Sequence, residues 1–534
     1  MDGPTYDGVV LGAGHNALVL LAYLCRAGLR VLAIERATAP GGGLATVENP
    51  RHPGFLHNPH SFFHRGATDM PWFRDLELGV RYVEPELNAA MLLRDGRALE
   101  WWTDLDRTVA SFAEFSRTDA AVLRRWALEF QPIVEQILAP EARSPPLEPG
   151  RRRLLLERSA LGRRLLEVSA MSPLEFVQKE FECDAVRAGL LFFNGLREVD
   201  LRLRGFGHSI PSLLAAPRKA QMCVGGSAAL ANALVADVQA HGGQVRCGVE
   251  LRSILVENGR ASGVELSTGE RVHARGFVAS GLNPQQTFVD LLPAEHVPPS
   301  LRKQAAGFEY NVIAPLFAVQ AALREPPHYR AAAARPELDR AFLVIIGLEG
   351  LDQFEGMVRA HEAGAPPPHV AWGACPTLFD STQAPPGCHT AFLWHKAPYA
   401  LHGDPLRWDA EKEAYGRSLL GTWSEYAPNL DRSAVIDVFY QSPLDTERSL
   451  PNMRGGDLLV GAFTNGQVGY NRPFPGAGAY RAPIPGLYLC GGSTHPGGNV
   501  TGLCGYNAAS VIAADAGLVP WWSAPRLEDV LPTA

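Results

Sequence analysis

Three small residues near the start of the chain have a spacing that binds dinucleotides. Gly12, Gly14 and Ala17 form the pattern G-x-G-x-x-A after a short apolar run. Gly12 permits a tight turn, Gly14 lets the backbone approach a pyrophosphate, and Ala17 keeps helix and strand close together. His15 and Asn16 complete the turn, where the first N–H groups of a helix would face the phosphates. We therefore predict that these five residues contact a cofactor.

A carboxylate and a second glycine-rich turn indicate which dinucleotide binds. Glu35 lies 21 residues after Gly14, where a carboxylate accepts hydrogen bonds from ribose hydroxyls and disfavours a 2′-phosphate. The turn over residues 36–45 offers the cofactor another close backbone approach. A flavin dinucleotide, which has a longer reach, needs such a turn, whereas NAD seldom does. The predicted contacts in this turn are Arg36, Gly42, Gly43, Leu44 and Ala45.

A third glycine-rich stretch lies near the end of the chain. Residues 486–509 are typical of a strand, a glycine loop and a helix. The positive potential of a helix N-terminus suits the flavin edge that becomes anionic on reduction. The predicted flavin contacts are Gly491, Gly492, Asn499, Val500, Thr501 and Gly502. Together the three glycine stretches predict FAD.

Three side chains near the last glycine stretch could take part in the reaction. His495 lies in the glycine loop, and an imidazole can donate or accept a proton near neutral pH. Tyr470 and Arg472 belong to a polar, aromatic loop shortly before it. We predict that all three line the reacting end of the flavin. The alternative is structural: His495 would cap a backbone carbonyl, and Arg472 would pair with an acidic residue.

The elements that position these residues follow a nucleotide-binding pattern. Residues 9–11 and 31–34 read as buried strands around an amphipathic helix. The same pattern returns with a helix over 228–240, a hairpin and a strand that ends at Gly281, another predicted cofactor contact. The predicted fold class is therefore α/β: a Rossmann-type FAD-binding domain with an inserted α+β substrate domain.

The predicted substrate domain contains an antiparallel sheet. Its strands are expected over residues 312–319, 341–346, 370–373 and 390–395. The predicted FAD-binding domain is discontinuous and comprises residues 1–105, 215–300 and 455–534. The substrate domain comprises residues 106–214 and 301–454.

Composition excludes several classes of protein. With 534 residues the chain can form two or three domains, and its net charge of −7 argues against nucleic acid as a partner. The eight cysteines form no C-x-x-C pair, which argues against a zinc site or disulfides and favours a reducing cytoplasm. The sequence contains no apolar run of 18 residues, so no transmembrane helix is expected.

Two further stretches have competing interpretations. The spacing of His52, His57, His60 and His64 is irregular, so we favour a loop that lines a cofactor or substrate channel over a metal site. Residues 151–166 read as one basic amphipathic helix. Such a helix either packs its leucines inward or touches an anionic membrane surface, so at most peripheral membrane contact is expected.

The motifs GAGHNAL, IERATAPGGGLAT, GGSAALANAL and GLYLCGGSTHPGGNVTGLCGYNAA carry a resemblance that spans the chain. The sequence resembles the phytoene desaturase-like flavoproteins, which include carotenoid desaturases, retinol saturase and a mitochondrial pyridine nucleotide-disulfide oxidoreductase-like branch. The resemblance implies that Glu35 binds the adenosine ribose and that Val249 contacts adenine. It also implies that Gly12, Gly14, Gly42 and Gly43 flank the pyrophosphate and the flavin ring.

By this resemblance the chain is an FAD-dependent oxidoreductase that moves hydride between a C–C bond and flavin N5. The expected substrate is an apolar or cyclic small molecule, and the expected electron acceptor is oxygen, a quinone or another carrier. Desaturation, saturation and isomerisation all stay open, as does the oligomeric state. An amine oxidase is the alternative enzyme, for which Lys303 and Lys396 are the lysines to examine. A non-catalytic, FAD-bound partner protein is the alternative of another class.

Overall fold

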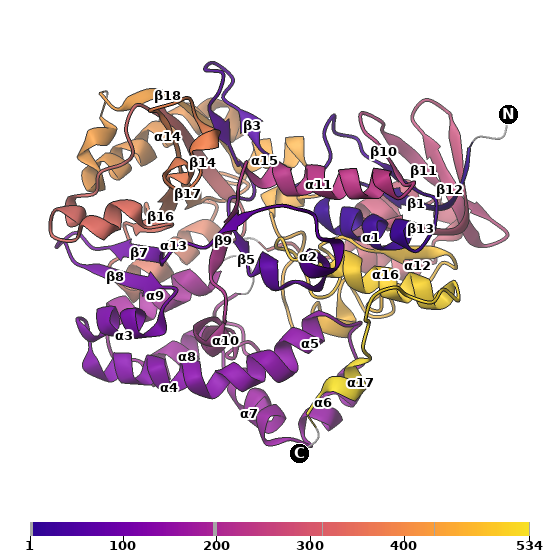
Figure 1. Cartoon of the computed structure of the whole chain (residues 1–534), viewed down its shortest axis with the longest axis horizontal. Coiled ribbons are helices and arrows are strands. Elements are labelled where there is room, and N and C mark those ends of the chain that lie inside the picture. The colour runs from indigo at the N-terminus through magenta and orange to yellow at the C-terminus, as the bar shows by residue number, and fades with distance from the viewer. Residues whose placement is uncertain (1–3, 196–199, 312, 432, 533–534) are drawn as a thin grey trace.

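The computed structural model describes residues 4–195, 200–311, 313–431 and 433–532. In this part of the chain two large sheets carry most of the strands (Figure 1). One sheet ends in the glycine turns, and the other forms part of a large cavity.

The first sheet joins strands from three distant stretches of the chain, as the sequence predicts. Its strand order is β10-β2-β1-β13-β12-β11, with β19 beside β13. The parallel strands are β1 (Thr5–Leu11), β2 (Val31–Ile34), β10 (Gln244–Arg246), β13 (Arg271–Ser280) and β19 (Leu487–Leu489). The antiparallel hairpin consists of β11 (Leu251–Glu257) and β12 (Arg260–Leu266). Because parallel strands end at the same edge, the turns after β1, β2, β13 and β19 lie close together.

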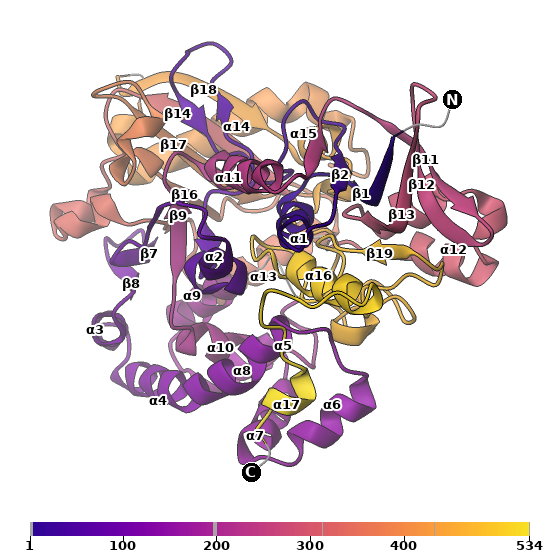
Figure 2. The ribbon, with the colours of Figure 1, turned by 45° about the vertical axis from the view of Figure 1, so that its right-hand side comes forward.

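Three helices that follow glycine turns pack together beside this sheet. They are α1 (His15–Arg26), α11 (Ser227–Ala240) and α16 (Leu503–Asp515). Helix α1 lies between the other two, and residues 18–24 of α1 are almost fully buried (Figure 2). A Cβ on Gly505 would lie 1.8 Å from the carbonyl oxygen of Asn16, so glycine is required where α16 touches α1.

The second sheet is almost entirely antiparallel, as predicted. Its strand order is β18-β14-β17-β16-β15-β7-β8. Among the described neighbouring strands of this sheet, only β15 and β7 run parallel to each other. The strands are β7 (Leu87–Leu92), β8 (Ala98–Trp102), β14 (Leu316–Leu323), β15 (Val344–Ile346), β16 (Ala371–Ala374), β17 (His389–Lys396) and β18 (Val435–Gln441). Val312, the first residue of one predicted strand, lies outside the described residues.

The pairing of β7 bears on the predicted domain limits. Residues 1–105 are assigned to the FAD-binding domain, yet β7 and β8 belong to the second sheet. Met91 of β7 is the partner of Ile345 of β15, more than 250 residues away in the chain. A hairpin is a local signal, whereas its partner sheet depends on long-range packing. We therefore propose that the first cofactor segment ends before residue 87.

A layer of helices lies below the second sheet in Figure 1. It contains α3 (Leu105–Ala113), α4 (Arg117–Ile133), α5 (Ala139–Ala142), α8 (Pro173–Glu180), α9 (Asp184–Gly195) and α10 (Ser209–Ala215). Asp104 caps α3, because its carboxylate accepts a hydrogen bond of 2.8 Å from the N–H of Arg107. The layer and the sheet together enclose an apolar core.

The prediction of one continuous basic helix over residues 151–166 is wrong. The stretch forms two helices, α6 (Pro149–Leu156) and α7 (Ala160–Ser169), because Ser159 caps a new helix. Leu155 and Leu165 are buried, and Arg152 pairs with Glu141 at 2.5 Å. Three leucines of this stretch (Leu155, Leu156 and Leu165) therefore pack inward, which is the first of the two interpretations, whereas Leu154 is exposed. Membrane contact stays a prediction, and none of the described helices is long and apolar enough to cross a bilayer.

Candidate cofactor and substrate site

The first two glycine turns touch each other through their backbones. The N–H of Gly41 donates a hydrogen bond of 2.8 Å to the carbonyl of Ala13. Gly42 has a φ of +58°, and a Cβ there would lie 3.2 Å from the Cα of Gly14. Only glycine combines this backbone conformation with such a close approach. The turns thus present bare backbone on one side, which suits a pyrophosphate.

Glu35 connects these turns at the end of β2. Its carboxylate accepts hydrogen bonds of 2.8 Å from the N–H of Ala13 and from the N–H of Ala37. The N–H of Val249 donates to the carbonyl of Glu35 at 3.0 Å, so Val249 lies beside this end of the site. The predicted contacts of Glu35 with ribose and of Val249 with adenine stay predictions.

A cavity of about 140 Å³ opens where the glycine turns meet, and we call it the glycine cavity. The predicted cofactor residues on its wall are Gly14, His15, Asn16, Ala17, Gly42, Gly43, Gly281, Gly491, Gly492, Asn499 and Val500. These residues come from all three glycine stretches and from the end of β13. The structure therefore brings together most of the contacts that the sequence predicts.

The remaining predicted contacts lie off the wall of this cavity. They are Gly12, Glu35, Arg36, Leu44, Ala45, Val249, Thr501 and Gly502. Leu44 is fully buried in the core, and the exposed Arg36 donates a hydrogen bond to the carbonyl of Ser449. The carbonyl of Thr501 accepts a hydrogen bond of 2.5 Å from the indole of Trp72, which also packs against Gly502. Thr501 and Gly502, held by Trp72, thus fix the start of α16.

Four buried polar atoms on the wall of the glycine cavity have no hydrogen-bond partner among the described residues. They are Asn16 Oδ1, His60 Nδ1, Trp394 Nε1 and Asn452 Oδ1. An unsatisfied buried polar atom costs about 1–3 kcal/mol, so four such atoms on one wall indicate a site for a ligand with donors and acceptors. The ring edge of a flavin carries both. The residues present therefore fit FAD.

Trp394 and Asn452 are residues that sequence reasoning missed. Trp394 lies on β17, and Asn452 follows α15 (Pro443–Ser449), so both come from outside the glycine stretches. Their local sequence contains no motif that indicates a cofactor. His60 belongs to the histidine-rich loop, which was predicted to line a channel. No group of three or more metal-ligating side chains occurs among the described residues.

The three predicted catalytic side chains do not line the wall of this cavity. His495 Nε2 lies 2.8 Å from the carbonyl of Glu141, and burial lowers the pKa of the imidazole. Arg472 is fully buried and donates only to backbone carbonyls. Tyr470 lies in a short 3₁₀ turn, Gly469–Asn471. His495 thus meets a backbone carbonyl, as the structural alternative expects, whereas Arg472 meets backbone carbonyls in place of the expected acidic residue. The catalytic roles of the three residues stay predictions.

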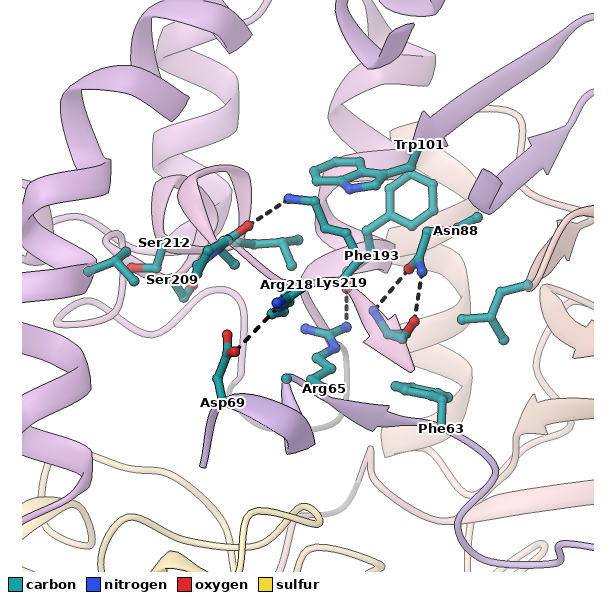
Figure 3. Close-up of a pocket in the computed structure, with 18 of the residues that line it drawn as sticks. Phe63, Arg65, Asp69, Asn88, Trp101, Phe193, Ser209, Ser212, Arg218 and Lys219 are labelled. Atoms are coloured by element: carbon teal, nitrogen blue, oxygen red, sulfur yellow. Dashed lines mark hydrogen bonds and ion pairs between the residues drawn. The ribbon is translucent and has the colours of Figure 1, made fainter. Parts of the chain in front are cut away.

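A second, larger cavity adjoins the glycine cavity, and we call it the large cavity (Figure 3). Its volume is about 610 Å³, and Phe63 lines both cavities. Trp372 of the large cavity packs edge to face against Trp394, with ring centroids 6.0 Å apart. Further apolar groups on the wall are Trp101, Val134, Leu138, Phe192, Phe193, Leu343 and Ile345. The large cavity can hold an apolar molecule beside the cofactor site.

The two lysines named for an amine oxidase have different positions. Lys396 is fully buried on the wall of the large cavity, with Nζ 5.8 Å from the centre of the Trp372 ring. Lys303 lies exposed on α12 (Pro299–Ala306), and it lines neither cavity. Of these two lysines, Lys396 is therefore the one placed to meet a substrate.

Buried histidines around the glycine cavity predict a loss of stability in acid. Burial lowers the pKa of His15 and His60 to about 4 and that of His64 to about 3. Below the unfolded-state value of about 6.5, the unfolded chain binds protons that the folded chain cannot bind. The free energy of unfolding thus has its full value above pH 6.5 and falls as the pH drops toward 3. The loss is about 2 kcal/mol per histidine at pH 5.

The measurement is the midpoint of thermal unfolding at a series of pH values from 7.5 to about 4.5. The His64 ring forms hydrogen bonds with Ser61 at 3.0 Å and with Tyr82 at 2.8 Å. His64→Gln removes this imidazole, so the variant should lose less stability in acid. The exposed His296→Gln variant is the control and should keep the wild-type profile. An unchanged acid-induced loss in His64→Gln would contradict the prediction.

Comparison with known proteins shows which proteins the chain resembles. Residues 10–76 match the family model of an NAD(P)-binding Rossmann-like domain. The chain is 31% identical to one of the subunits of limonene dehydrogenase from Castellaniella defragrans, over 97% of this chain and 96% of that protein. It is 28% identical to mouse pyridine nucleotide-disulfide oxidoreductase domain-containing protein 2, over 96% and 94% of the two chains. A lycopene-forming phytoene desaturase of Pseudescherichia vulneris is 23% identical over 93% of this chain and 96% of that protein.

Solved structures support the fold alone. Cyclohexylamine oxidase from Brevibacterium oxydans superposes with a TM-score of 0.57 and 15% identity, over 96% of this chain and all of that chain. The overall arrangement of a Rossmann-like domain and an antiparallel sheet is thus one that known oxidoreductases share.

Proposed function

Because the chain belongs to the phytoene desaturase-like family of FAD-dependent oxidoreductases, we propose that it oxidises a carbon–carbon bond of an apolar small molecule. The single observation that carries this proposal is the large cavity, which has aromatic and aliphatic walls and meets the glycine cavity at Phe63. A substrate held in the large cavity would lie next to the cofactor.

The residues of the glycine cavity would hold FAD through backbone and polar contacts. Gly14 and Gly42 leave room for the pyrophosphate, and the free polar atoms of Asn16 and Asn452 can bind the polar edge of the flavin. When bound, FAD supplies the hydride acceptor. The indole of Trp394 closes the wall toward the large cavity.

The large cavity contributes positioning and the exclusion of water. Trp372, Ile345 and Leu343 present apolar surface, so a hydrocarbon segment gains by leaving water. A C–H bond held in a dry site close to the acceptor needs little further help, because the cofactor performs the difficult step. The electron acceptor that reoxidises the protein is proposed to be oxygen or a quinone.

Narrowing the large cavity tests this function. Ala89 of β7 lines the cavity and is buried, so Ala89→Phe should fill part of the space without touching the glycine cavity. We expect unchanged FAD content and a loss of more than about tenfold in the rate of flavin reduction by substrate. The exposed Ala410→Phe variant on α14 (Arg407–Tyr426) is the control.

The rate is measured as anaerobic bleaching of the flavin by a panel of compounds. The panel contains limonene, which the name of one relative includes, a polyene, a cyclic ketone, an apolar carboxylic acid and a primary amine. Bleaching by the amine alone would favour the amine oxidase alternative, with Lys396 as the residue to test. Bleaching by none of them would favour the non-catalytic alternative, and conversion without net reduction would indicate an isomerase.

A further inference from the structure

Lys219 lies on the wall of the large cavity, away from the cofactor side. It directly precedes β9 (Ala220–Cys223), which pairs with β5 (His64–Arg65) so that Arg65 lies opposite Ala220. Phe63 and Lys219 thus flank this pair at opposite ends, roughly 10 Å apart along the strands. Figure 3 shows the Lys219 side chain extending toward Trp101 and away from Phe63.

The described residues give the Lys219 ammonium one hydrogen bond and no ion pair. Its Nζ donates to the carbonyl of Ala216 at 2.9 Å and lies 5.7 Å from the centre of the Trp101 ring. Glu84 is the nearby carboxylate, but it accepts from the backbone N–H of Lys219 at 2.9 Å and pairs with Arg218 at 3.1 Å. The ammonium carries three donors, so two are available to a ligand.

The other charged groups on this part of the wall already have partners. Arg218 also pairs with Asp69 at 3.3 Å, and Arg143 donates to the carbonyl of Asp69 at 3.1 Å. Burial lowers the pKa of Lys219 to about 8, so most of it is protonated at neutral pH. A cation held in an apolar wall is costly without an anionic partner, and a substrate can supply that partner.

We propose that the substrate of the large cavity is an apolar carboxylate whose charged group binds Lys219 and whose hydrocarbon chain or ring extends toward Phe63. This inference rests on the proposed function of the cavity and names its substrate class. Beside the Lys219 ammonium, Trp101 and Phe193 pack with ring centroids 5.1 Å apart and provide apolar surface at that end of the cavity. Lys219 would therefore fix which carbon of the substrate reaches the cofactor.

The experiment compares acids with their methyl esters on the FAD-loaded protein. The probes are decanoate, methyl decanoate, 4-isopropylbenzoate and its methyl ester, and binding is followed by calorimetry and by changes in the flavin spectrum. Each acid should bind about tenfold or more tightly than its ester, which is the effect of one charge-assisted contact. Lys219→Met should abolish this preference, and Lys219→Arg should retain part of it. The exposed Lys303→Met variant is the control and should keep the preference in full.

Two results would overturn the proposal. One is equal or absent binding of acid and ester by the wild-type protein. The other is a preference for acids that survives in Lys219→Met, which would leave Lys219 as a cap for the last carbonyls of α10. The thermal midpoint of Lys219→Met verifies folding. Failure of the proposed function itself is read separately, from unchanged flavin reduction in Ala89→Phe.

Discussion

Gly14→Val should give a folded protein that holds no FAD. Gly14 has a φ of −68°, which valine adopts readily, and a Cβ at this position would meet no atom within 4 Å. That open space belongs to the glycine cavity, where the backbone must approach the pyrophosphate. The branched side chain would fill it. We expect FAD affinity to fall by more than about a hundredfold, a loss of about 2.7 kcal/mol or more.

The measurement is the ratio of FAD to protein after purification and after reconstitution, with circular dichroism to verify folding. Gly421→Val is the matched control, because Gly421 lies exposed on α14 and a Cβ there also meets no atom within 4 Å. The control should bind one FAD per chain, like the wild type. Full FAD occupancy in Gly14→Val would show that the first glycine turn does not hold the pyrophosphate.

Arg472→Met should destabilise the protein strongly. The guanidinium is fully buried and donates hydrogen bonds to five backbone carbonyls, those of Val460, Gly461, Ala462, Gln467 and Gly492. Methionine satisfies none of them, so the loop loses its central donor. We expect a loss of about 3–5 kcal/mol, because several buried carbonyls lose their hydrogen-bond donor at once. Because Val460 and Gly492 line the glycine cavity, FAD should also bind less tightly.

Thermal unfolding of the FAD-loaded protein measures this effect. The control is Arg481→Met, since Arg481 pairs with Asp515 near the surface at 2.7 Å and should contribute about 1 kcal/mol or less. Arg472→Lys retains the charge but has fewer donors, so its stability should fall between those of the wild type and Arg472→Met. Unchanged stability with a shifted pH profile of flavin reduction would instead support the catalytic role that the sequence suggested.

The sequence by itself determined the cofactor fold. Turns such as those at Gly12 and Gly42 need a positive φ, and a buried parallel strand needs a continuous apolar run. Both are local requirements, so residue types and spacing reveal them without knowledge of the rest of the chain. The same reasoning explains why the second sheet was predicted, since alternating and apolar runs of strand length are also local signals.

Only the tertiary structure decided which side chains face the two cavities. Trp394 and Asn452 reach the glycine cavity, and Phe63 meets the large cavity, because elements from distant parts of the chain pack there. His495 is the reverse case, a residue predicted to line the site that does not do so. It lies in a predicted cofactor loop, but its imidazole points to the carbonyl of Glu141, 354 residues away. The direction of a loop side chain depends on the backbone around it and on which buried polar group needs a partner. The spacing of residues in the sequence contains neither piece of information, so only the folded structure reveals the direction of the side chain.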